Sequence, residues 1–140
     1  MPMILHTDRY FEHLYDVKND LVFVKWPTIE TIYLPEIMHS VSKLVQNVTN
    51  YNVRHLLIDA SLSQNLASHE EANQVIYLLT EGLAKSRLEK LARVESSNVN
   101  REMMLRQMVI EMNQQYPFET RFFREVAAAR RWMESDSGRL

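Results

Sequence analysis

The feature that most constrains the fold is the segment of residues 53–79, which reads VRHLLIDASLSQNLASHEEANQVIYLL. Three successive large aliphatic residues at 56–58 predict a strand that is buried on both faces, as in the interior of a parallel sheet. A polar loop follows, and then Ser68 and Glu71 stand at the spacing of a helix capping box. Strand, polar loop and capped helix in this order predict a β-α unit, so we expect an α/β fold.

The flanking sequence extends this pattern in both directions. Ahead of the central strand, two β-branched and aromatic runs are separated by a polar turn, which predicts an antiparallel hairpin. Apolar residues at helical spacing then alternate with further short strands. We expect strands at 10–16, 21–26, 54–60, 88–96 and 119–123, and helices at 31–50, 68–82, 101–115 and 124–134.

This order predicts a mixed, mostly parallel sheet of four to five strands, with an opening β-hairpin and about four covering helices. A chain of 140 residues is the size of one domain, so we expect a single domain over 1–140 with its core at about 10–134. Gly82 is expected to end the second helix as a C-terminal glycine. Two further helices are expected to turn their apolar residues inward, namely Met104, Leu105, Met108, Val109 and Met112, and then Val126, Ala127, Ala129 and Met133.

Composition argues against several classes of function. The chain has only two glycines, whereas the phosphate-binding loops of nucleotide-binding proteins need several. It has no cysteine, which excludes disulfides and thiolate chemistry. The net charge of −2 does not favour nucleic-acid binding. The N-terminus has too short an apolar run for a signal peptide, and no run is long enough to span a bilayer, so we expect a cytoplasmic protein without stable membrane insertion.

Four segments together resemble the SpoIIAA-like or STAS-like family, the sulfate transporter and anti-sigma factor antagonist domains with their SEC14-like lipid-binding relatives. They are LVFVKW at the end of the hairpin, RHLLIDAS at the central strand, LARVES, and RFFREVAAARRWM near the end of the chain. The resemblance covers residues 10–133. It implies the fold described above and a non-enzymatic protein-interaction or regulatory function.

The resemblance also implies a position for a regulatory switch. Regulatory members of the family carry Asp-Ser-Ser-Gly after this strand, and a kinase phosphorylates the serine nearest the following helix. Here the corresponding residues are Asp59-Ala60-Ser61-Leu62, so Asp59 and Ser61 match, whereas the first serine and the glycine do not. The candidate switch or docking residues are therefore Asp59, Ser61, Ser63 and Ser68. The alternative interpretation is that these serines satisfy backbone groups of the loop.

Catalytic and metal sites find less support in the residues. Asp59, Ser61 and His69 are the residue types of a hydrolase triad, but no G-x-S-x-G elbow accompanies them. His69, Glu70 and Glu71 are consecutive on a helix and so point in different directions. We therefore expect no catalytic residues, no metal and no cofactor. Arginines and lysines after residue 84 are expected to mix with acids on the surface, with an anionic headgroup or acidic partner as the alternative.

Two functional hypotheses remain. The first is an interaction module that presents the loop 59–68 and the following helix to a protein partner. The second is a small-molecule or lipid carrier of the SEC14-like type, suggested by the eight methionines and the aromatic residues. Met103 and Ile110 lie off the predicted buried face of the third helix, which suggests a homodimer contact as a further possibility.

Overall fold

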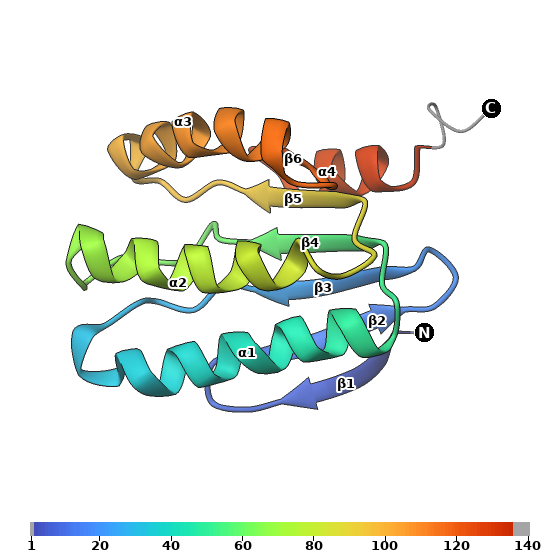
Figure 1. The fold of residues 1–140 in the computed structure, drawn as a ribbon, viewed down its shortest axis with the longest axis horizontal. Coiled ribbons are helices and arrows are strands. Elements are labelled where there is room, and N and C mark those ends of the chain that lie inside the picture. The colour runs from blue at the N-terminus through green and yellow to red at the C-terminus, as the bar shows by residue number, and fades with distance from the viewer. Residues whose placement is uncertain (1, 136–140) are drawn as a thin grey trace.

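The computed structural model describes residues 2–135. This part of the chain forms one six-stranded mixed sheet with four α-helices (Figure 1). A short 3-10 helix, η1, precedes the first α-helix at Thr31–Tyr33. The strands are β1 Met3–Thr7, β2 Glu12–Asp16, β3 Leu21–Lys25, β4 His55–Asp59, β5 Lys90–Val94 and β6 Glu119–Phe123, and the helices are α1 Leu34–Asn50, α2 His69–Leu83, α3 Val99–Gln115 and α4 Val126–Met133.

The strands lie in the sheet in the order in which they occur along the chain. The first three form an antiparallel meander, and β3, β4, β5 and β6 are parallel neighbours. The predicted hairpin is confirmed by the pairing of β2 with β3. The predicted interior strand is confirmed as well, because β4 lies between β3 and β5 and Leu56 and Leu57 are fully buried.

The strand count of four to five was too low because the sequence pattern did not indicate β1. Met3 and Ile4 are 46% and 58% exposed, so this edge strand has no buried alternating face to detect. It forms by antiparallel pairing with β2, with an irregularity between Ile4 and His6. The sheet is also less parallel than expected, since two of its five strand pairings are antiparallel.

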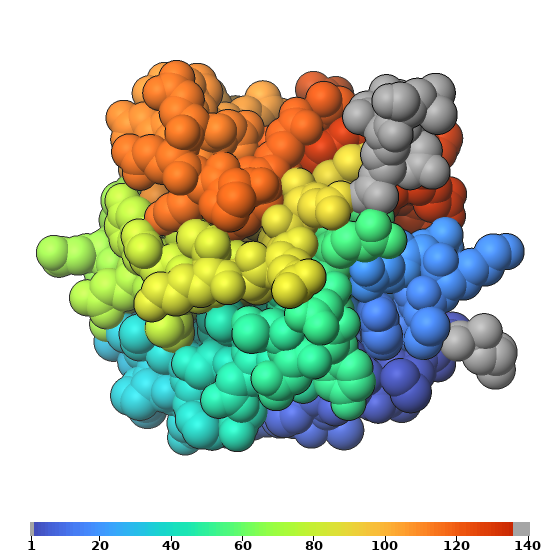
Figure 2. Space-filling view, turned by 45° about the vertical axis from the view of Figure 1, so that its right-hand side comes forward, coloured from blue at the N-terminus to red at the C-terminus, as the bar shows by residue number. Residues whose placement is uncertain are grey.

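Two hydrophobic layers lie on opposite faces of the sheet. The larger one contains residues of α1, α2 and the sheet together with Leu105 of α3, and these three helices lie over the same face (Figure 1). The smaller one joins Leu21, Leu57 and Ala92 of the sheet to Ala129 and Met133 of α4. In the space-filling view, α1 and α2 lie side by side in one continuous surface (Figure 2). Three helices on one face follow from successive right-handed crossovers between neighbouring parallel strands.

Gly82 does not serve as a C-terminal glycine. Helix α2 continues to Leu83, and Gly82 has no positive φ angle. Its lack of a side chain is needed for a different reason, because a Cβ at this position would lie 2.6 Å from Cγ1 of Val45 on α1. The glycine therefore permits close packing of two helices.

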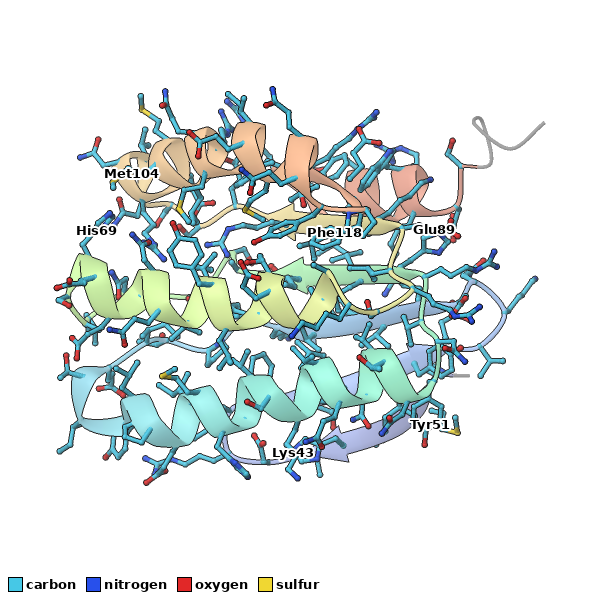
Figure 3. The ribbon with its side chains drawn as sticks, in the orientation of Figure 1. Lys43, Tyr51, His69, Glu89, Met104 and Phe118 are labelled. Carbon is cyan, nitrogen blue, oxygen red and sulfur yellow. The ribbon has the colours of Figure 1, made fainter. Side chains whose placement is uncertain are left out.

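The predicted inward faces of α3 and α4 were partly wrong. On α3 the buried residues are Glu102, Leu105 and Met112, whereas Met104 is 43% exposed (Figure 3). The helix is turned so that Glu102 meets an arginine of β5, as described below, and this turn moves Met104 outward. On α4, Ala129 and Met133 are buried as expected, but Ala127 is exposed.

Candidate functional site

The carboxyl ends of the parallel strands β3 to β6 gather several loops at one edge of the sheet, on the left in Figure 1. The loops are residues 26–30 after β3, 60–68 after β4, 95–98 after β5 and 124–125 after β6. His69 and Met104 lie at this edge, and Tyr51 and Glu89 lie at the opposite one (Figure 3). Parallel strands that are neighbours in chain order have no point where the strand order reverses. The deep crevice that binds ligands in doubly wound sheets is therefore not formed here.

The loop after β4 is fastened to the loop after β3. Ile29 and Asn65 form an isolated parallel bridge. The backbone N–H of Ile29 donates to the carbonyl of Gln64 at 2.9 Å, and the N–H of Leu66 donates to the carbonyl of Ile29 at 2.8 Å. These bonds give the loop 60–68 a defined position without a helix or a strand of its own. Its side chains are therefore presented from a fixed backbone.

Asp59 organises the first turn of this loop. Its Oδ1 accepts a hydrogen bond from the backbone N–H of Ser61 at 3.0 Å, which is the local side-chain to backbone bond typical of aspartate in turns. The hydroxyl of Ser61 is exposed and makes no hydrogen bond to a residue that the structure describes. Ser61 does not lie at a helix N-terminus, because α2 begins eight residues later, after its N-cap Ser68.

The other two candidate serines have structural roles. The half-buried Ser63 donates its hydroxyl to the carbonyl of Pro27 at 2.9 Å. Ser68 is the N-cap of α2 and forms the predicted capping box: its Oγ accepts from the N–H of Glu71, and Oε1 of Glu71 accepts from the N–H of Ser68, both at 3.0 Å. Of the three candidate serines, Ser61 alone therefore has an uncommitted hydroxyl.

A groove of about 460 Å³ runs from Ser61 to the start of α3. Val99 and Met103 contribute apolar surface to it and are 69% and 58% exposed. Arg124 also lines the groove and is exposed, and Arg106 lies there in an ion pair with Glu95. We call this the Ser61 groove. Sequence reasoning did not find it, because its walls come from segments that are distant in the chain.

A buried ion pair lies beneath the groove. Arg93 of β5 holds Glu102 of α3 by two hydrogen bonds, from Nε to Oε1 at 2.9 Å and from Nη2 to Oε2 at 3.1 Å. The hydroxyl of Ser96 donates to the same carboxylate at 2.6 Å. Burial alone would raise the pKa of Glu102, but the hydrogen bonds and charge of Arg93 and the bond from Ser96 outweigh it and lower this pKa. Glu102 is therefore ionised at neutral pH.

The residues considered for catalysis are not arranged as a triad. His69 is an exposed residue in the first turn of α2, and Oδ1 of Asp59 accepts from the Ser61 backbone instead of orienting an imidazole. Within residues 2–135 no three or more histidine, aspartate or glutamate side chains are grouped so that they could hold a metal ion. Among the described helices none is both long and apolar enough to cross a membrane.

No protein-family model, no curated protein and no solved structure matches this chain.

Proposed function

We propose that this chain is a non-enzymatic protein-interaction or regulatory module of the STAS-like type. It would present the loop 60–68 and the Ser61 groove to a protein partner. The observation that carries the proposal is the uncommitted hydroxyl of Ser61 on an anchored loop. The loop geometry supports Ser61 as the switch, in preference to Ser63 and Ser68, because the other two hydroxyls hold the loop and the helix together.

The surface around Ser61 has the chemistry of a docking site. Leu62 is 85% exposed on the loop, and Val99 and Met103 are exposed across the groove. Exposed apolar groups rimmed by charges are typical of protein–protein contacts. These side chains come from two elements with fixed backbones, so a partner would meet a preformed surface.

Phosphorylation of Ser61 would change this surface through charge. A phosphoryl group adds about −1.5 to −2 charges and strong hydrogen-bond acceptors. Arg124 lines the same groove and would attract it, and Arg106 would be drawn away from Glu95. The apolar rim would then be flanked by a dianion, and binding of an apolar partner would weaken.

The test uses affinity capture from a bacterial lysate with three forms of the protein. Leu62→Asp places a charge on the proposed surface. Val17→Asp is the matched control, because Val17 is 61% exposed in the turn between β2 and β3 at the opposite edge of the sheet. We expect a partner that is retained by the wild type and by Val17→Asp and lost with Leu62→Asp. Equal retention by all three forms would contradict the proposed surface.

A second experiment tests the switch. The purified protein is incubated with ATP and the same lysate, and the peptide covering residues 60–68 is analysed by mass spectrometry. We expect phosphate on Ser61 and weaker partner binding by Ser61→Asp than by Ser61→Ala. Phosphate on Ser63 or Ser68 alone would remove Ser61 from this role.

The alternative function, a small-molecule or lipid carrier, has weaker support. The apolar space between α2, α3 and the sheet has a volume of about 40 Å³, which is enough for a few water molecules and far too small for a lipid. Native mass spectrometry of freshly purified protein distinguishes the two functions. A stoichiometric apolar ligand that co-purifies would favour the carrier.

A further inference from the structure

A second groove adjoins the Ser61 groove and shares Ser96 and Ser97 with it. It has a volume of about 250 Å³ and lies between the anchored loops after β3 and β4 on one side and the start of α3 on the other. We call it the Arg101 groove. Arg93 and Arg101 line it, and no acidic residue among those described does. It therefore has a cationic lining.

The charges at this groove do not balance. Glu102 is the carboxylate beside the two arginines, and both of its oxygens are bound by Arg93, with Ser96 as an additional donor. The Nη1 atom of Arg101 is buried and has no hydrogen-bond partner in the described part of the chain. Burial, followed by the charge of Arg93, lowers the pKa of Arg101, and Glu102 only partly opposes this. Arg101 is thus a partly buried cation without a counter-ion of its own.

A partly buried cation without a counter-ion destabilises the fold unless an anion accompanies it. A buried donor without a partner costs about 1–3 kcal/mol, and more when the group is charged. Arg101 nevertheless occupies this position in the first turn of α3, directly beside the groove. An anion in the groove would place a negative charge beside this guanidinium, without reaching the buried Nη1 atom itself.

Other donors converge on the same space. The positive end of the α3 dipole lies at Asn98, whose side chain caps only the N–H of Arg101 at 3.0 Å. Ser97 lines this wall, and Gln64 and Asn65 line the opposite one. Donors on two walls suit a tetrahedral oxyanion better than a planar carboxylate. The volume lies below the roughly 300–1,000 Å³ of pockets for larger organic ligands.

From these observations we propose that the Arg101 groove binds inorganic phosphate, with Arg101 as its principal ligand. The site is separate from the Ser61 hydroxyl and does not depend on the proposed partner binding. If both exist, the shared Ser96–Ser97 wall would place the bound anion next to the docking surface.

The test is a titration of the 140-residue chain with inorganic phosphate, monitored by backbone amide NMR shifts, with sodium chloride holding the ionic strength constant. We expect saturable shifts at Ser96–Arg101 and at Gln64–Leu66, with a dissociation constant in the millimolar range or below. Acetate serves as the planar carboxylate arm and is expected to shift these amides at least fivefold less at equal concentration. Absence of saturation with phosphate, or stronger binding of acetate, would overturn the proposal.

Variants assign the site. Arg101→Met keeps the apolar stem and is expected to weaken phosphate binding at least tenfold. Arg87→Gln is the control and should bind as the wild type does, because Arg87 is exposed between α2 and β5 at the opposite edge of the sheet. Unchanged phosphate binding by Arg101→Met would contradict the role of Arg101.

The folding of Arg101→Met is checked by its thermal midpoint, which we expect to stay at or above that of the wild type, because an unpartnered cation is removed. Should this variant fail to fold, Arg101→Lys replaces it. Lysine keeps the charge but not the planar fork of donors, so a several-fold loss of affinity is expected. Full affinity in Arg101→Lys would contradict recognition by the guanidinium.

Discussion

The side chain of Val45 lies so close to Gly82 that a Cβ at position 82 would stand 2.6 Å from Cγ1 and 3.0 Å from Cγ2 of the valine. The contact lies where α1 packs against α2, and Val45 is β-branched, so it has few alternative rotamers. Gly82→Ala would stabilise the fold by about 1 kcal/mol through its higher helix propensity, but overpacking at a close helix contact costs about 1–3 kcal/mol. We expect a net loss of about 1 kcal/mol in the free energy of unfolding, measured with urea.

The double variant Val45→Ala/Gly82→Ala is the control for this interpretation. Removing the two γ-methyl groups makes room for the new Cβ, so the double variant should be more stable than the sum of the two single changes predicts. Strict additivity of the two changes would show that the contact does not determine the residue at position 82.

The ion pair of Arg93 and Glu102 predicts that removing one partner destabilises the fold more than removing both. The side chains are 12% and 5% exposed, and loss of one partner from a buried pair typically costs about 3–5 kcal/mol. We expect Glu102→Leu to be strongly destabilising and the double variant Arg93→Met/Glu102→Leu to recover most of the loss. Chemical unfolding at pH 7 measures both. A double variant as unstable as the single one would contradict this prediction.

The same pair predicts how acid affects the fold. Because the pKa of Glu102 is lowered in the folded state, its contribution to stability is present above the ordinary glutamate pKa of about 4.3 and is lost as pH falls through the folded value. The double variant Arg93→Met/Glu102→Leu should therefore lose less stability than the wild type on acidification below pH 4. Identical acid profiles would mean that other carboxylates dominate.

His13 predicts a pH dependence in a different range. His13 lies on β2 and its side chain is fully buried facing α1, where Nδ1 lies 3.0 Å from Nδ2 of Asn47 and Nε2 has no partner in the described residues. Burial, with a smaller effect of the neighbouring His6, lowers the pKa of His13 from 6.5 to about 4, although Asp8 opposes the shift. The unfolded state therefore binds the extra proton first as pH falls.

From this difference we expect stability to decrease between pH 6.5 and pH 4, by about 2 kcal/mol at pH 5, since each pKa unit corresponds to about 1.4 kcal/mol. Urea unfolding at pH 7, 6 and 5 measures the slope. His13→Phe keeps an aromatic ring but cannot titrate, so its slope should be shallower. Equal slopes for the two proteins would exclude His13 as the cause.

The capping box predicts unequal effects of two serine changes. Ser68→Ala removes the side chain that accepts from the N–H of Glu71, and loss of such a cap costs about 1 kcal/mol. Ser61→Ala removes an exposed hydroxyl without a described partner, so its effect should lie within about 0.5 kcal/mol. Thermal unfolding of the two variants provides the comparison. A loss of 1 kcal/mol in Ser61→Ala would contradict an uncommitted hydroxyl.

Local patterns in the sequence were sufficient for much of the fold. The run at 56–58 is apolar on both faces, so β4 could be placed inside a sheet. The capping-box spacing of Ser68 and Glu71 indicates where α2 begins. Strand β6 was predicted with its observed bounds, Glu119–Phe123. These features depend on residues within one turn or one strand, and for this reason a single sequence reveals them.

Tertiary packing decided the remaining features. Strand β1 exists through its pairing with β2, Gly82 is required by Val45 from another helix, and the orientation of α3 depends on the ion pair of Glu102 with Arg93. The two grooves arise because parallel strands bring the loops after β3, β4 and β5 to one edge. Each of these depends on contacts between segments that are distant in the chain. Local propensity and periodicity carry no information about such contacts.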